Sequence, residues 1–126
     1  MTNQLSRSLL AASAAVLAFA GLLHATAFNK AASAVASSNL PVLYANVLKA
    51  FWLMNSTTLI LLAIVFGLTA IRPHVATGSV IVLLALIPAA IAVLLYMFMG
   101  MFIPAHMLLA AAAIAFFAGW LRKQKV

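Results

Sequence analysis

The chain alternates between four long apolar stretches and short polar breaks. The apolar stretches run over about residues 8–28, 40–71, 77–99 and 103–122. A helix needs about 20 apolar residues to cross a hydrocarbon core of about 30 Å, so each stretch is long enough to span a bilayer. Backbone groups cannot stay unpaired in lipid, and no stretch shows the alternation of a barrel strand. The pattern predicts an all-α integral membrane bundle of four transmembrane helices, forming one domain over residues 1–126.

The breaks contain residues that start and end helices. Asn39 is a good N-cap, and Pro41 fits the first turn of the second helix. Arg72-Pro73 disfavours helical geometry and predicts a tight turn. Pro88 differs because it falls in the middle of the third helix, where it removes a backbone hydrogen bond. We expect it to kink that helix.

The charge composition supports a membrane location. The chain contains no Asp or Glu, seven Lys or Arg, and 68% apolar residues. Ordinary soluble proteins are about one quarter charged, with both signs present. The basic residues here are scattered or lie at segment ends, whereas a nucleic-acid-binding protein clusters them on one solvated face. The expected partner is therefore the lipid bilayer, and no nucleic-acid partner is expected.

The distribution of basic residues predicts an orientation. With four crossings, both termini and the turn at Arg72 share one side of the membrane. That side holds five basic residues, and the other holds two: Arg7, Arg72, Arg122, Lys123 and Lys125 against Lys30 and Lys49. The positive-inside rule then places both termini in the cytoplasm, most naturally those of a bacterial inner (plasma) membrane protein.

The first apolar stretch allows a second interpretation. Arg7, an apolar run and Ala25-Thr26-Ala27 together resemble a secretory signal with a small-residue cleavage site. Cleavage of residues 1–27 would leave three helices in the same topology. The apolar run of about 20 residues is longer than a usual signal core and favours the uncleaved, four-helix form.

Two helices carry faces of small residues. Association in lipid depends on close backbone approach, which small side chains allow. We therefore expect the first and fourth transmembrane helices to pack tightly, either within one bundle or between copies of the chain. The residues that would form these faces are Ala14, Ala18 and Gly21, and Ala111, Ala115 and Gly119.

Polar residues in the second helix are the first candidates for a binding site: Lys49, Asn55, Ser56 and Thr58. Lys49 lies 22 residues before Ile71, which corresponds to about 33 Å of helix. Its ammonium group can therefore snorkel to the outer interface. The other three can bond neighbouring helices or their own backbone. The functional alternative is that all four residues line a ligand pocket.

Two histidines form a second candidate site. His24 and His106 are both expected about one helical turn below the outer surface, and Met97 and Met101 lie at the same level. Imidazole with thioether suits Cu(I), and two imidazoles can hold a haem iron. The chain has no carboxylate to orient the imidazoles, so hydrogen bonding to a neighbouring helix is the alternative.

The residue inventory bounds the function. Without Cys there are no disulfides or thiolate metal sites. Nothing is visibly arranged to activate the remaining Ser, Thr, His or Lys, so we do not expect an enzyme. The sequence favours a non-catalytic structural or accessory bundle, without a cofactor, that self-associates or packs on other membrane subunits. The alternatives are a copper- or haem-binding membrane protein and a small oligomeric transporter or anion channel.

Overall fold

The computed structural model describes residues 2–123, and every regular element within them is a helix. In chain order these helices are α1 (Thr2–Thr26), α2 (Phe28–Ala36), α3 (Val42–Ile71), α4 (Gly78–Met99) and α5 (Ile103–Lys123). Helices α1 and α2 follow one another closely enough to form one apolar stretch. The described residues thus contain four stretches long and apolar enough to span a membrane. This confirms the predicted all-helical class with four apolar helices.

The helix bounds differ from the prediction at the start of the chain. Helix α1 already begins at Thr2, and a further helix, α2, occupies residues that the apolar pattern left unassigned. Alanine favours helix wherever nothing opposes it, and α2 is rich in alanine. It ends at Ser37 and Ser38, whose hydroxyls donate to the main-chain oxygens of Ala34 and Val35 instead of continuing the helix.

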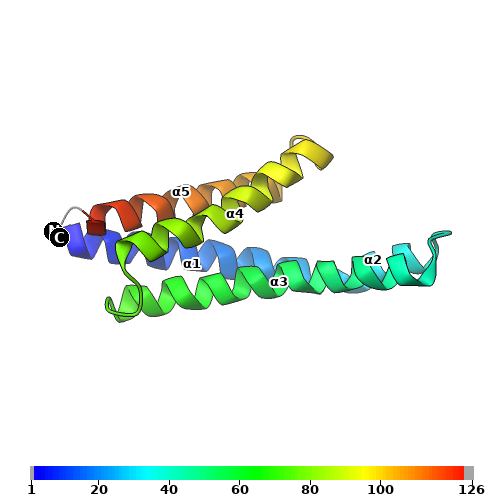
Figure 1. Ribbon diagram of the computed structural model, residues 1–126, viewed down its shortest axis with the longest axis horizontal. Coiled ribbons are helices and arrows are strands. Elements are labelled where there is room, and N and C mark those ends of the chain that lie inside the picture. The colour runs from blue at the N-terminus through cyan, green and yellow to red at the C-terminus, as the bar shows by residue number, and fades with distance from the viewer. Residues whose placement is uncertain (1, 124–126) are drawn as a thin grey trace.

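Helix α1 forms the centre of the bundle. It packs against α3 on one side and α5 on the other, and α4 packs on α5 (Figure 1). Helices α3 and α4 touch only sparsely, so the bundle is open along that side. The start of α1, the α3–α4 turn and the end of α5 gather at one end, called the basic end below because Arg7, Arg72, Arg122 and Lys123 belong to it.

The opposite end, called the far end below, is uneven. Helix α2 and the first part of α3 extend together as a hairpin beyond the remaining helices (Figure 1). Helix α4 and the turn that leads into α5 diverge from this hairpin. Gly100 makes that turn possible, since its φ of 70° lies in the left-handed region that favours glycine.

Close backbone approach holds the helices together. Ser6 donates to the main-chain oxygen of Ala118 at 3.0 Å, which joins α1 to α5. Helices α4 and α5 approach even more closely, because a Cβ added to Gly119 would lie only 2.8 Å from the main-chain oxygen of Gly78. Such contacts between small residues and hydroxyl groups are the ordinary means of helix association in lipid.

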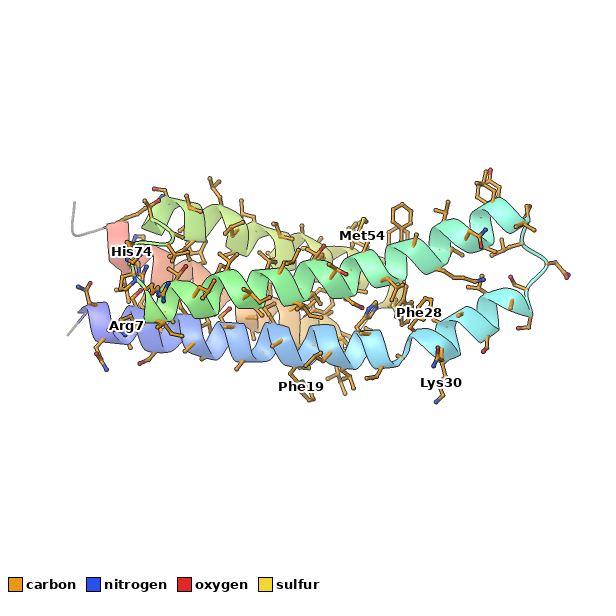
Figure 2. The ribbon with its side chains drawn as sticks, turned by 90° about the horizontal axis from the view of Figure 1, so that it is seen from below. Arg7, Phe19, Phe28, Lys30, Met54 and His74 are labelled. Atoms are coloured by element: carbon orange, nitrogen blue, oxygen red, sulfur yellow. The ribbon has the colours of Figure 1, made fainter. Side chains whose placement is uncertain are left out.

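Many large apolar side chains lie on the outside of the bundle, although some, such as Phe66, are buried inside it. Alanines make up much of the interior, together with four buried hydroxyl residues: Ser6, Ser13, Ser56 and Thr69. Large apolar side chains point outward; Phe19 is 58% exposed and Leu83 is 64% exposed. Figure 2 shows Phe19 directed away from the bundle. Soluble proteins rarely leave such extensive apolar surface in contact with water.

Pro88 lies inside α4, which runs without a break from Gly78 to Met99. Its side chain is fully buried, on the same face as Ala85 and Ala92. The ring therefore belongs to the packed side of α4. The kink expected at this residue stays a prediction.

Candidate functional site

A polar cluster joins the end of α1 to the middle of α3. Nδ1 of His24 lies 2.8 Å from the hydroxyl oxygen of Ser56. The His24 imidazole also stacks on the Trp52 indole, with ring centroids 4.2 Å apart and planes 15° from parallel. In addition, Nε1 of Trp52 donates to the main-chain oxygen of His24 at 2.8 Å. These three contacts fix the orientation of His24 and tie α1 to α3.

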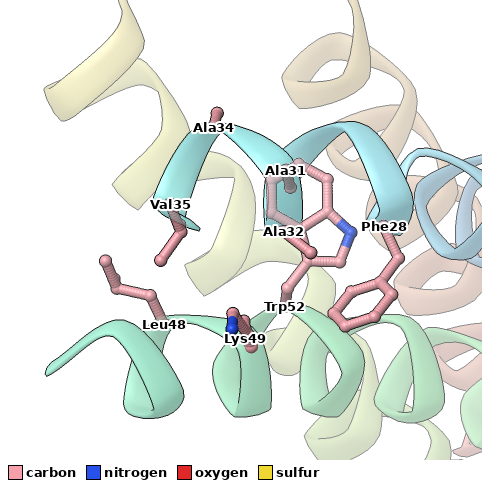
Figure 3. Close-up of a pocket in the computed structure, with 8 residues that line it drawn as sticks. All are labelled: Phe28, Ala31, Ala32, Ala34, Val35, Leu48, Lys49 and Trp52. Carbon is pink, nitrogen blue, oxygen red and sulfur yellow. The ribbon is translucent and has the colours of Figure 1, made fainter. Parts of the chain in front are cut away.

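An apolar pocket of about 300 Å³ lies next to this cluster, between α2 and α3 (Figure 3). Trp52 forms part of its wall, whereas His24, which stacks on Trp52, does not line the pocket. Lys49 is the one charged residue that lines it. The remaining lining residues are Phe28, Ala31, Ala32, Ala34, Val35 and Leu48. The pocket could hold an apolar group with an anionic end near Lys49.

The four polar residues predicted to line one pocket do not gather in it. Lys49 lines the pocket, but Ser56 bonds His24 and does not line it. Thr58 donates its hydroxyl hydrogen to the main-chain oxygen of Met54, one turn earlier in the same helix. Asn55 is half-buried and does not line the pocket. Of the four residues, only Lys49 lines this pocket.

The two histidines have different partners. Nδ1 of His106 is hydrogen-bonded to the hydroxyl of Tyr96, which pairs α5 with α4, whereas His24 pairs α1 with α3. Met97 and Met101 are 72% and 87% exposed at the far end. Within residues 2–123, no group of three or more His, Cys, Asp or Glu gathers as metal ligands do. Copper or haem binding remains an untested hypothesis.

The small residues singled out from the sequence lie at helix contacts. Gly21 faces α3, since an added Cβ would lie 2.9 Å from Cγ1 of Ile60. Ala14 is buried against the same helix, near Gly67, while Ala18 is half-buried. On α5, all three of the predicted small residues are buried: Ala111, Ala115 and Gly119. The small residues Ala14 and Gly21 of α1 thus meet α3, whereas the hydroxyls of Ser6 and Ser13 bond to α5.

Arg122 forms a clamp at the basic end that the sequence pattern did not identify. Its Nε donates to the hydroxyl oxygen of Ser6 at 3.0 Å. Its Nη2 donates to the main-chain oxygen of Thr69 at 3.2 Å, and its Nη1 donates to those of Pro73 and Ala76 at 3.3 and 3.4 Å. One guanidinium group therefore joins α5 to α1, to the end of α3 and to the α3–α4 turn.

Arg7 lies beside this clamp. Its Nε donates to the main-chain oxygen of Ala70 at 2.7 Å. Arg7 and Arg122 line a common pocket of about 350 Å³, together with Asn3, Pro73, Ala76, Thr77 and Gly78. Figure 2 shows Arg7 at the basic end, near His74. From the sequence, these arginines indicated only orientation. One signal in the sequence could have indicated this clamp. In a chain without carboxylates, arginines must donate to other acceptors, such as main-chain oxygens.

No protein family, curated protein or solved structure matches this chain. The fold and its sites define an open bundle of apolar helices with three polar centres. These are the His24–Trp52–Ser56 cluster, the Tyr96–His106 pair and the arginine pocket at the basic end.

Proposed function

We propose that this protein is a small integral membrane protein with a non-catalytic, structural or accessory role, which assembles with further copies of itself or with other membrane subunits. The observation that carries this proposal is the large number of big apolar side chains on the outside of the bundle, around an interior rich in alanine that also holds four hydroxyl residues and a few large apolar ones. Lipid favours such a surface, while small residues and hydrogen bonds hold the helices together.

A bacterial inner membrane with both termini in the cytoplasm is the proposed location. It is supported by the gathering of Arg7, Arg72, Arg122 and Lys123 around one end of the bundle. Basic residues concentrate on the cytoplasmic side of membrane proteins. The hairpin of α2 and α3 would then project on the outer side, with Lys30 and Lys49 near its base.

The structural role is supported by how the polar side chains are used. Among the described residues, no buried side-chain nitrogen or oxygen lacks a hydrogen-bond partner. Most long-range bonds run from a side chain of one helix to the main chain of another, as with Ser13 and Ala111. Groups engaged in this way hold helices in place and are poorly suited to act as nucleophiles or proton carriers.

Assembly is supported by the open side of the bundle. Helices α3 and α4 make little contact with each other, and each presents large apolar residues outward. Leu61 of α3 is 56% exposed and Leu86 of α4 is 53% exposed. These exposed side chains would be the contact surface for a neighbouring membrane helix.

Cysteine crosslinking in native membranes tests this proposal, because the chain contains no cysteine of its own. We expect Leu61→Cys or Leu86→Cys to form a disulfide-linked dimer, or a thiol-reactive crosslink to another membrane subunit. Ala85→Cys is the matched control on α4, since Ala85 is 1% exposed and should not react. A chain that stays uncrosslinked at both outward positions and is purified as a monomer without other subunits would contradict assembly.

The same purified sample separates the alternatives. Copper or haem present at one equivalent, and lost in His24→Ala or His106→Ala, would replace the structural role with a cofactor-binding one. Anion flux into liposomes that depends on Lys49 would instead indicate a channel or transporter. The proposed role predicts neither result.

A further inference from the structure

The two arginines at the basic end differ in how far their hydrogen-bonding capacity is used. A guanidinium group has five N–H donors. Arg122 directs Nε, Nη1 and Nη2 to four oxygen atoms and is held rigidly. Among the described residues, Arg7 is held by its Nε alone. This bond orients the guanidinium group and, within the described part of the chain, leaves its Nη1 and Nη2 donors free to bind a ligand.

The pocket between these arginines is electrostatically unbalanced. No Asp or Glu occurs anywhere in the 126 residues, so no side chain of this chain can neutralise Arg7 or Arg122. Both guanidinium groups nevertheless line one pocket of about 350 Å³, with Asn3 at its wall. That volume lies at the lower end of the range of ligand pockets, about 300–1,000 Å³. An anion from outside the chain would both fill the pocket and balance its charge.

We propose that this pocket binds a phosphate group. Arginine forks match the spacing of phosphate oxygens and form two parallel, charge-assisted hydrogen bonds with them. Basic pockets between helices on the cytoplasmic side of membrane proteins bind lipid head groups in this way. The phosphate belongs either to the head group of an anionic phospholipid or to free inorganic phosphate. The lipid source depends on the membrane location proposed above, whereas binding of free phosphate does not.

The test uses the full chain purified in a neutral detergent and stripped of lipid. Native mass spectrometry counts the phosphatidylglycerol molecules bound to each chain. Phosphatidylcholine with acyl chains of equal length is the control, because it carries no net charge. In a parallel arm, inorganic phosphate is titrated and the thermal unfolding temperature is recorded, with chloride at equal ionic strength as the reference. Binding of phosphatidylglycerol alone identifies a lipid head group, and stabilisation by inorganic phosphate identifies the free anion.

Three variants separate a pocket from general attraction between charges. Arg7→Gln removes the fork and should weaken binding about tenfold or more, the loss expected for a charge-assisted bidentate contact. Arg7→Lys keeps the charge without the fork and should recover only part of the affinity. Arg72→Gln is the matched control, because it removes one positive charge from the same end but does not line the pocket. It should change binding less than twofold.

Several outcomes would overturn the proposal. One is an equal loss of binding affinity in Arg7→Gln and Arg72→Gln. Another is equal binding of the two lipids together with no stabilisation by inorganic phosphate. The third is full binding affinity in Arg7→Lys. Helical circular dichroism and gel-filtration elution show whether each variant folds, and if Arg7→Gln does not, Arg7→Lys decides. Because the phosphate arm is read in detergent, its result is independent of whether the bundle assembles with partners.

Discussion

The hydroxyl of Ser13 on α1 donates to the main-chain oxygen of Ala111 on α5 across 2.9 Å, and both residues are fully buried. The oxygen of Ala111 also belongs to the backbone of its own helix. A hydroxyl can reach it only where the facing helices are very close, and the absence of a side chain beyond Cβ on Ala111 allows that approach. This contact therefore measures how tightly α1 and α5 pack.

Ser13→Ala should lower the free energy of unfolding by about 0.5–1.5 kcal/mol, since it removes one interhelical hydrogen bond without creating a clash. Titration of the purified protein with a denaturing detergent, followed by circular dichroism, measures the change. Ser33→Ala is the control, because Ser33 is exposed and donates to Asn29 within its own helix. An equal loss in both variants would mean that the α1–α5 bond contributes nothing specific.

The contact between α4 and α5 leads to a second prediction. Gly119→Ala would place a Cβ 2.8 Å from the backbone oxygen of Gly78, so the helices must separate. We expect a loss of about 1–3 kcal/mol, as for other overpacked contacts.

Gly67→Ala provides the comparison, since its added Cβ would meet only the Cβ of Ala14, at 3.8 Å. This variant should be neutral or more stable by up to about 1 kcal/mol, because glycine is a poor helix former. The same detergent titration ranks the two variants. If Gly119→Ala is as stable as Gly67→Ala, the close approach of α4 and α5 is wrong.

Trp52→Phe tests the cluster at the end of α1. Phenylalanine can still stack on His24 but cannot donate to its main-chain oxygen, so we expect a loss of about 1 kcal/mol. Trp120→Phe is a suitable control, because Trp120 is 45% exposed and stacks only on Phe117. Unfolding followed by circular dichroism serves for both variants, since each removes one of the two tryptophans. A larger loss for Trp120→Phe would show that the cluster is not a stabilising contact.

The proposed orientation is tested with single cysteines in the turns. In intact cells, a membrane-impermeant maleimide should label Ser38→Cys, in the turn between α2 and α3, and should not label His74→Cys, in the turn between α3 and α4. Permeabilised cells should label both. The opposite pattern would reverse the topology, and labelling of both positions in intact cells would contradict a single orientation in the membrane.

The sequence predicted the apolar helices well because their signal is simple. About 20 consecutive apolar residues specify a spanning helix whatever its neighbours are. Helix α2 was not predicted because its nine residues, four of them alanine, are too few to carry such a signal, and α2 packs against α3. That contact adds to the helix preference of its alanines, and no local pattern in the sequence records it.

The sites could be predicted only in part. Depth along the helices placed His24 and His106 at one level, but depth does not show which helices are neighbours. The structure instead pairs His24 with Trp52 and Ser56, and His106 with Tyr96. The arginine pocket was missed because its partners are mainly main-chain oxygens, which every residue has. Which of these oxygens the arginines reach depends on where the end of α3 and the α3–α4 turn lie in three dimensions.

The central position of α1 also bears on the order of folding. A ribosome makes α1 before α5, and the acceptors for the hydroxyls of Ser6 and Ser13 lie 112 and 98 residues further along the chain. Until those acceptors emerge, both hydroxyls must bond within α1 or to solvent. Contacts of α1 with α3 can therefore form before those of α1 with α5, because α5 is the last helix to be made.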